Sequence, residues 1–192
     1  MSAFTLENGR QLLLETADIL DELGIRFFLM QGTALGAYRD HGFTPTEADI
    51  DFGVLVEHLY PKQLVDALMD QDYQIETFSL PFHRIRTIVA WKYGIHVDIV
   101  GFIRWGAKRF THSPVHPSVR EPYAIVHDAG ILETYQSVEL FGRQFDIPSP
   151  IERYLQLEYG DDWRTPKLDH VSRTRVYDFI RKESVPHDLL GT

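Results

Sequence analysis

The segment Asp49–Val54, which reads Asp-Ile-Asp-Phe-Gly-Val, is the stretch of this chain that decides its fold class. Successive side chains of a β-strand point to opposite faces, so the two aspartates share one face and the apolar residues share the other. Two carboxylates on one face repel each other unless a cation lies between them, and oxygen ligands on rigid strands suit Mg²⁺ or Mn²⁺. Taken alone, the pair is equally compatible with the solvated end of an acidic strand.

A third carboxylate, Asp98, supports the metal interpretation. It lies in the otherwise apolar run 95–102, where an unpaired buried charge would be strongly destabilising. A shared metal ion compensates all three carboxylates at once, whereas a salt bridge from Asp98 to Arg84 or Arg86 would compensate only one. The predicted metal-binding and catalytic residues are therefore Asp49, Asp51 and Asp98.

The sequence on either side of these strands alternates between helical and extended patterns. Apolar residues recur every three or four positions in the first segment, which ends at Gly24, and a short apolar run follows it as a buried strand. Helices are expected over 9–23, 34–39, 61–70, 149–158 and 169–183, and strands over 25–30, 49–56, 73–78, 82–91, 95–103 and 138–145. This order indicates one α/β (α+β) domain over 1–192, with a mixed sheet flanked by helices and a helical C-terminal segment.

The run Gly-Thr-Ala-Leu-Gly at 32–36 joins the first predicted strand to a short helix. Glycine lets the backbone approach a ligand phosphate, and the N–H groups at a helix start attract anions. A Gly-Thr pair is also common in ordinary turns, so its meaning here comes from its position before the acidic strands. The residues expected to contact phosphate are Gly32, Thr33 and Gly36.

Several arginines are candidates for holding an anionic substrate. Arg39 follows the glycine run by about one turn and is either a phosphate ligand or a surface cap. Arg84 and Arg86 share a strand face, where they either clamp a diphosphate or form salt bridges. The basic stretch 104–120 contains two prolines and no acidic residue, so it is expected to be a loop that closes over bound substrate, or else a passive surface excursion.

The composition excludes several classes of function. A formal net charge of −9 and a pI near 5.4 argue against a general nucleic-acid binder, because such proteins present a basic face. The absence of cysteine excludes thiolate zinc sites and cysteine nucleophiles. No apolar run is long enough to span a membrane, and we expect a cytoplasmic protein.

Two parts of the sequence together resemble the LicD and fukutin-like transferases of the nucleotidyltransferase superfamily. The first part is 32–45 followed by 49–53, which is similar to the family's Gly-Thr/Ser-x-Leu-Gly-Ala-x-Arg, Gly-hydrophobic-x-Pro and Asp-hydrophobic-Asp motifs. The second part is 147–150 with 154–163, which looks like the family's closing Leu-x-x-x-Tyr-Gly-x-x-Trp signature. At 46–48, Thr-Glu-Ala stands where many relatives carry a tryptophan and two further aspartates.

The resemblance implies a metal-dependent transfer of a phosphorylated head group, such as phosphocholine or a phospho-alditol, from a CDP-linked donor to an acceptor hydroxyl on a glycan or small molecule. CMP would leave, Asp98 would help to deprotonate the acceptor, and Glu47 is a possible additional base. The same carboxylates would also serve a nucleotidyltransferase that releases pyrophosphate, and a catalytically silent domain on this fold is a further alternative. His96 is interpreted as a satisfied core histidine or a partner of Asp98, and Trp163 either packs the C-terminal helices or covers a nucleotide base.

Overall fold

The computed structural model describes residues 4–79, 86–112, 123–166 and 182–184. Its helical elements are α1 (Leu6–Glu22), α2 (Gln31–Leu35), the π-helical turn η1 (Gly36–Asp40), the 3-10 turn η2 (Val56–His58), α3 (Pro61–Asp70), α4 (Ala129–Glu133) and α5 (Ile151–Tyr159). Its strands are β1 (Phe27–Leu29), β2 (Asp49–Leu55), β3 (Gln74–Ser79), β4 (Arg86–Lys92), β5 (Ile95–Trp105), β6 (Lys108–His112), β7 (Tyr123–Asp128), β8 (Tyr135–Leu140), β9 (Arg143–Pro148) and β10 (Lys182–Ser184).

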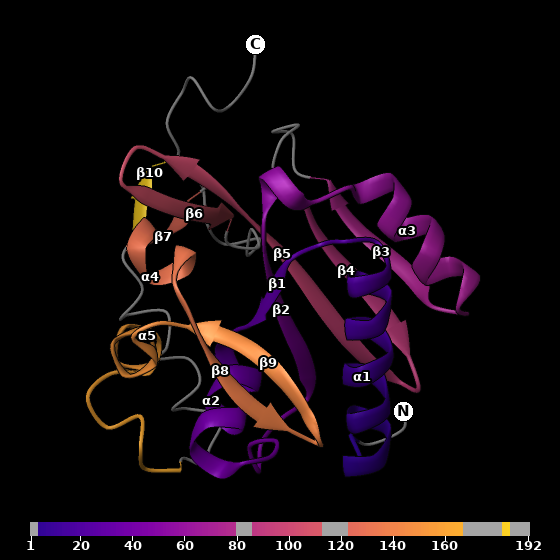
Figure 1. Cartoon of the computed structure of the whole chain (residues 1–192), viewed down its shortest axis with the longest axis horizontal. Coiled ribbons are helices and arrows are strands. Elements are labelled where there is room, and N and C mark those ends of the chain that lie inside the picture. Colours follow the sequence, from indigo (N-terminus) through magenta and orange to yellow (C-terminus); the bar gives the residue numbers. More distant parts are fainter. Residues whose placement is uncertain (1–3, 80–85, 113–122, 167–181, 185–192) are drawn as a thin grey trace.

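The main sheet is mixed, as the sequence predicts, and the long strand β5 organises it (Figure 1). The first part of β5 pairs in parallel with β2 and antiparallel with β4, which gives the strand order β1-β2-β5-β4-β3. The end of β5 pairs with β6, and the sheet continues through β7 to β10. Strands β8 and β9 form a separate hairpin.

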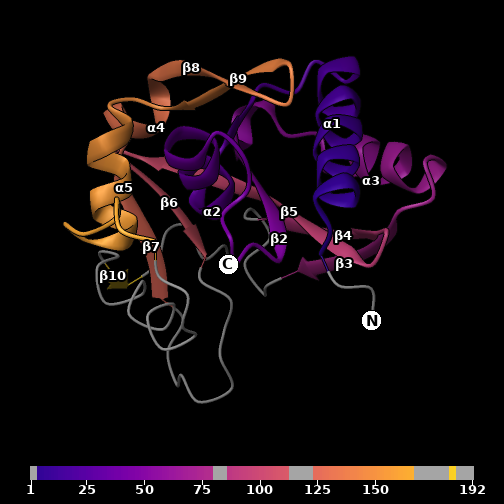
Figure 2. The same cartoon turned by 90° about the horizontal axis from the view of Figure 1, so that it is seen from below.

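One face of the main sheet forms the core with α1 and α3 (Figure 2). The apolar residues of β2 that alternate with the aspartates have no exposed surface at all, and those of β5 next to them are equally buried. They are Ile50, Phe52, Val54, Val97 and Ile99. The alternation predicted from the sequence therefore sends the apolar side of β2 into the core and leaves its aspartates on the opposite face.

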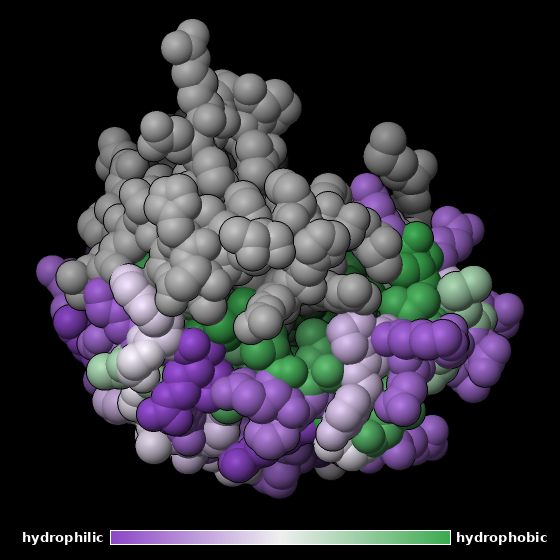
Figure 3. Space-filling model, turned by 90° about the horizontal axis from the view of Figure 1, so that it is seen from above, coloured by the Kyte–Doolittle hydropathy of each residue, from purple (hydrophilic) through white to green (hydrophobic). Residues whose placement is uncertain are grey.

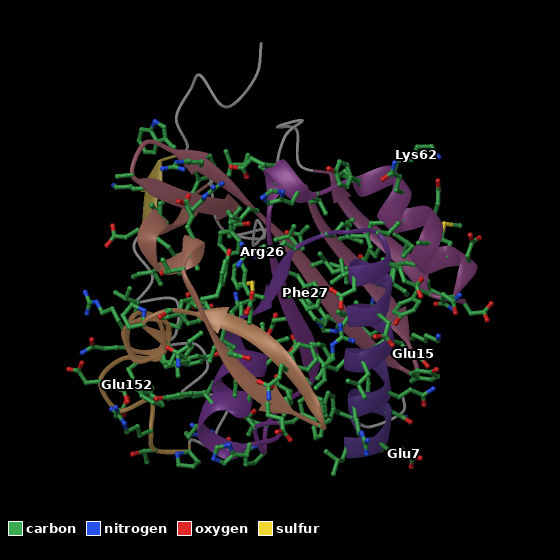
Figure 4. All side chains as sticks on the ribbon, in the orientation of Figure 1. Glu7, Glu15, Arg26, Phe27, Lys62 and Glu152 are labelled. Atoms are coloured by element: carbon green, nitrogen blue, oxygen red, sulfur yellow. The ribbon has the colours of Figure 1, made fainter. Side chains whose placement is uncertain are left out.

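The β8–β9 hairpin closes the core on the side of β1. The Phe27 ring, labelled in Figure 4, lies 5.3 Å from the Phe52 ring and 6.5 Å from the Phe145 ring. The guanidinium of Arg26 covers the Tyr135 ring at 4.6 Å. In the middle of β2 a Cβ atom at Gly53 would overlap the Phe28 ring, so only glycine fits where β1 and β2 pack this closely.

Two sequence-based expectations about the C-terminal half are wrong, and a third is contradicted only at its end. The single strand expected over 138–145 is a hairpin, because the chain reverses at Phe141 and Gly142, both with positive φ. The basic loop expected over 104–120 begins as a β-hairpin, since β5 runs to Trp105 and β6 follows after a two-residue turn. The helix expected over 169–183 falls mostly outside the described residues, but Lys182–Ser184 is a strand paired with β7.

The surface of the described residues is mixed in polarity. Figure 3 shows polar side chains along the edge of one face, with apolar groups gathered between them and the segments drawn in grey. Among the described helices, none is both long enough and apolar enough to cross a membrane.

Candidate active site

Strands β2 and β5 bring the predicted carboxylates together on the face away from α1. Their parallel register places Asp51 opposite Asp98, and Asp49 opposite His96. Side chains of residues paired on neighbouring strands lie on the same face, so four ionisable groups form one cluster. We call Asp49, Asp51, His96 and Asp98 the acidic cluster.

His96 makes a hydrogen bond to Asp49 and a longer ionic contact to Asp98. Its Nε2 lies 3.2 Å from Asp49 Oδ2 and 3.8 Å from Asp98 Oδ1. Ligand atoms of Asp49, His96 and Asp98 all lie within 4.8 Å of one another. The interpretation of His96 as a satisfied core residue is therefore wrong, because its side chain is 26% exposed and belongs to the cluster.

The pKa values of these groups follow from burial and crowding. Burial raises the pKa of Asp51 well above its usual value, and the neighbouring carboxylates of Asp49, Asp98 and Glu47 raise it further. Burial likewise raises the pKa of Asp98 to about 6, although the nearby His96 opposes this shift. The hydrogen bond to Asp49 raises the pKa of His96, against the effect of its own burial.

The acidic cluster has the chemistry of a divalent-metal site. Asp98 Oδ1 is buried and makes no hydrogen bond, its described ionic contact being His96 Nε2 at 3.8 Å, so a bound cation would satisfy it. Carboxylate oxygens suit Mg²⁺, and an added imidazole nitrogen also suits Mn²⁺. Asp49, His96 and Asp98 would hold the ion, and Asp51, the most buried of the four, lies beside them on the same face of the sheet.

The predicted phosphate-binding residues lie directly beside this cluster, but in a different local structure from the one expected. Gly32 and Thr33 belong to the first turn of α2 itself, which begins at Gln31. The Thr33 hydroxyl is fully buried and accepts a hydrogen bond of 2.9 Å from the backbone N–H of Asp51. Thr33 therefore fixes the start of α2 to the strand that carries Asp51.

Glu47 and Gly36 also have defined positions around the start of α2. A Cβ on Gly32 would lie 2.8 Å from both carboxylate oxygens of Glu47, so this carboxylate rests against the glycine backbone. The Thr44 hydroxyl donates a hydrogen bond of 3.3 Å to Glu47 Oε2. Gly36 is required by packing, because a Cβ there would lie 2.5 Å from the carbonyl oxygen of Gly42.

Arg39 anchors the C-terminal motif. Its guanidinium donates two hydrogen bonds to Asp40, at 2.8 and 2.7 Å, and one of 3.0 Å to the carbonyl oxygen of Trp163. Trp163 is buried, and its ring lies 6.0 Å from the Tyr38 ring. Trp163 thus packs inside the protein, with a described ring contact to η1 and not to the C-terminal helices that the sequence suggested. Arg39 would have to exchange these bonds to reach a phosphate.

The structure describes the remaining predicted arginines to different extents. Arg84 lies outside the described residues, and of Arg86 only the backbone is described, at the start of β4 opposite Ser79. The residue of β4 opposite Asp98 is Val89. Arg109, expected in a substrate-covering loop, is instead a buried strand residue that binds Glu57 and Glu133.

Sequence reasoning missed a buried polar group behind the cluster. His127 Nε2 lies 3.3 Å from Glu158 Oε1, and both side chains are almost fully buried. Burial lowers the pKa of His127 to about 4 and raises that of Glu158 to about 8, which favours the uncharged form of each side chain. Next to them the Tyr154 hydroxyl accepts a hydrogen bond of 3.0 Å from the Gln31 N–H, which ties α5 to the start of α2.

We expect divalent cations to stabilise the protein through the acidic cluster. Because the folded-state pKa of Asp98 is raised from 3.8 to about 6, the metal-free protein loses stability as the pH rises through that range. A bound cation removes this loss. At one hundred times its Kd, Mn²⁺ should stabilise the fold by about 2.7 kcal/mol, or roughly 5 to 10 °C in Tm. Thermal unfolding at pH 5 and pH 8 measures the effect.

The larger Mn²⁺ shift is expected at pH 8, where protons no longer compete for the ligands. Asp98→Asn should abolish the shift. Asp66→Asn is the matched control, because Asp66 is an exposed carboxylate on α3 that pairs only with Lys62 among the interactions described. An Mn²⁺ shift of the same size in Asp98→Asn and in the unmodified protein would place the bound ion elsewhere.

Known proteins are similar to this chain over most of its length. The LicD/FKTN/FKRP nucleotidyltransferase-domain model matches residues 24–149. The ribitol-5-phosphate transferase FKTN of Mus musculus is 36% identical over 161 residues, which is 83% of this chain and 34% of that protein. The Homo sapiens FKTN is 33% identical over the same length and the same shares. The chain thus spans about a third of the length of these curated relatives.

Solved structures support the fold alone. The solution structure of the antibiotic-resistance factor ANT(2″)-Ia superimposes with a TM-score of 0.55 at 13% identity, covering 91% of this chain and 83% of that one. The crystal structure of ANT(2″)-Ia with adenylyl-2″-tobramycin gives a TM-score of 0.50 at 15% identity, covering 88% and 85%. Because the family model matches residues 24–149, which is more than half of the chain, this chain belongs to the LicD/FKTN/FKRP nucleotidyltransferase-domain family.

Proposed function

We propose that this chain is a phosphotransferase that moves a phosphorylated alcohol from a CDP-linked donor to an acceptor hydroxyl and releases CMP. The observation that carries the proposal is the acidic cluster, in which three carboxylates and an imidazole meet beside the first turn of α2. Carboxylates held this close together repel one another unless a cation compensates them, and such clusters are typical of functional sites.

The name of the curated relatives favours ribitol-5-phosphate as the transferred group. The phospho-alditol class is therefore the first donor to test, ahead of phosphocholine. Because this chain matches about a third of those relatives, their activity is carried over here as a proposal and not as a property of this chain.

In the proposed reaction the acceptor oxygen attacks the phosphorus that carries the alcohol, and the bond from that phosphorus to the bridging oxygen of CMP breaks. The N–H groups of Gly32 and Thr33 at the start of α2 would bind the donor diphosphate, since the Gln31 N–H already donates to Tyr154. Asp98 takes the proton of the acceptor hydroxyl. A divalent cation held by the acidic cluster would neutralise charge on the phosphates and on the leaving oxygen.

The test is product analysis with a defined donor. The purified protein is incubated with CDP-ribitol and Mn²⁺, and nucleotide products are separated with water as the acceptor and then with neutral sugars. We expect CMP to form, and not to form with Asp51→Asn. Pyrophosphate release from CTP or ATP together with a nucleotidylated sugar, and no CMP from CDP-ribitol, would instead establish a nucleotidyltransferase.

A further inference from the structure

An exposed tryptophan borders the acidic cluster. Trp91 on β4 is 39% exposed, although large apolar side chains are usually buried. It pairs in register with His96 on β5, and the two rings lie 4.8 Å apart. An exposed indole in contact with a candidate metal ligand marks a surface on which a substrate can rest.

Trp91 lies on the same face of the sheet as the acidic cluster. Its neighbour Ala90 is fully buried on the opposite face. Its other neighbour, Lys92, reaches α1, where Nζ lies 2.8 Å from Glu15 Oε2. Because the side chains of successive strand residues point to opposite faces, the indole points away from α1 and lies on the face that carries the acidic cluster. This face continues across β4 and β3, at the end of the sheet far from α2 (Figure 2).

The strand order separates a donor side from an acceptor side. Starting from α2, the face presents the aspartates of β2, then His96 and Asp98 on β5, then Trp91 on β4. In a phosphoryl transfer the attacking and leaving oxygens lie roughly in line on opposite sides of the phosphorus. With the donor diphosphate at the start of α2, the acceptor must approach from the β4 side.

The charges around Trp91 indicate what kind of acceptor fits. Asp49 and Asp98 lie on one side, and the exposed Glu76 of β3, opposite Val89, is near enough to raise the pKa of both His96 and Asp98. A second anion would be repelled there. A neutral polyhydroxylated ring can instead place its C–H face on the indole while its hydroxyls donate hydrogen bonds to carboxylates.

We propose that Trp91 is the platform for a neutral sugar ring of the acceptor, and that it determines acceptor specificity. The position of the donor in this inference rests on the proposed function. The position of the acceptor platform rests on the Trp91–His96 contact and on the strand order. Trp91 acts by positioning the acceptor hydroxyl near Asp98, and it takes no part in the bond changes.

The test observes the indoles directly. The sequence contains three tryptophans, so ¹⁵N-labelled protein with Mg²⁺ gives three indole N–H signals, and Trp91→Phe assigns the one of interest. Titration with methyl glycosides of glucose, galactose, xylose and N-acetylglucosamine should shift the Trp91 signal for at least one sugar. Trp105, an equally exposed tryptophan at the far end of β5, should not respond. CMP should bind without a comparable shift at Trp91.

Activity gives the second readout. Trp91→Ala should weaken the responding sugar roughly three- to tenfold, seen as a higher KM. Trp105→Ala should leave both the KM for this sugar and the acceptor-free hydrolysis of CDP-ribitol to CMP unchanged, because Trp105 lies outside the acidic cluster. A Trp91 signal that responds to CMP and not to any glycoside, or to neither, overturns the proposal. A glycoside response with no CMP formed from CDP-ribitol would keep the sugar platform and refute the proposed donor chemistry.

Discussion

Asp51→Asn is expected to abolish transfer while leaving the protein folded. The Asp and Asn side chains have the same shape. The hydrogen bond to the Thr33 hydroxyl comes from the backbone N–H of residue 51, so it does not depend on the side chain of that residue. What the substitution removes is a negative charge at the most buried position of the acidic cluster, where Asp51 is 5% exposed. By comparison with the loss of one preorganised electrostatic group, the rate should fall by a factor of about 10² to 10³ or more.

The same substitution should raise stability when no cation is present. The carboxylate of Asp51 is disfavoured by burial and by repulsion from its neighbours, as its raised pKa indicates. A neutral amide removes both unfavourable terms, so the metal-free variant should unfold at a higher temperature than the unmodified protein. Loss of activity with gain of stability separates a functional role from a structural one, because a structural residue would lose both.

Asp66→Asn again provides the control, since it changes the same charge on an exposed helix position. The measurements are CMP release from CDP-ribitol and thermal unfolding without divalent cations. Turnover of Asp51→Asn within a few-fold of the unmodified protein would show that the chemistry takes place elsewhere. The parallel variant Asp49→Asn should lose activity to a similar degree, but with a smaller gain in stability, because Asp49 is more exposed.

Several elements of the fold were predictable because their signals are local. The alternation in β2 and the proline-led helix α3 can be recognised from a few consecutive residues, and the structure has α3 over the predicted range. The placement of Asp98 on a buried strand also follows from its apolar neighbours. Each of these depends on residue type and spacing within one element.

The role of His96 was not predictable in the same way. Its position two residues before Asp98 shows that both share a strand face, but an imidazole on such a face can equally be a packed core residue. What decides between these is the parallel register, which sets His96 opposite Asp49 and 3.2 Å from it. Register between strands far apart in the chain depends on tertiary packing, which a single sequence does not reveal.

The β5–β6 hairpin was missed because charge was interpreted as exposure. Arg104, Lys108 and Arg109 lie close together in the sequence, and such a run is typical of a solvated loop. The structure sorts them into different environments: Arg104 is 56% exposed at the side chain and Arg109 only 4%. The acidic partners that allow Arg109 to be buried come from η2 and α4, and no local pattern connects them to it.

Arg109→Met is therefore expected to destabilise the fold and not to weaken substrate binding. The Arg109 guanidinium donates hydrogen bonds of 2.7 and 2.8 Å to the two oxygens of Glu57 and one of 2.7 Å to Glu133. It thereby joins β6 to η2 and to α4, which lies beside β6 and β7 in Figure 1. Methionine keeps much of the volume but leaves both carboxylates without this partner.

Breaking a fully buried ion pair costs about 3 to 5 kcal/mol, because the remaining charge is left without compensation. Here Glu57 is 46% exposed and Glu133 25% exposed at their side chains, so water can partly replace the lost bonds. We expect a loss of about 2 to 3 kcal/mol in the free energy of unfolding, measured by urea denaturation at pH 7.

Arg104→Met is the matched control, because Arg104 lies 3.4 Å from the same Glu133 but is exposed. An exposed pair contributes about 0 to 1 kcal/mol, so this variant should be close to the unmodified protein. The substrate-covering alternative predicts the reverse pattern for Arg109→Met, with unchanged stability and weaker CMP binding at low ionic strength, where exposed charges act most strongly. Since the Arg109 guanidinium is already held by two carboxylates, a phosphate could recruit it only by displacing them, and the stability measurement decides between these two roles.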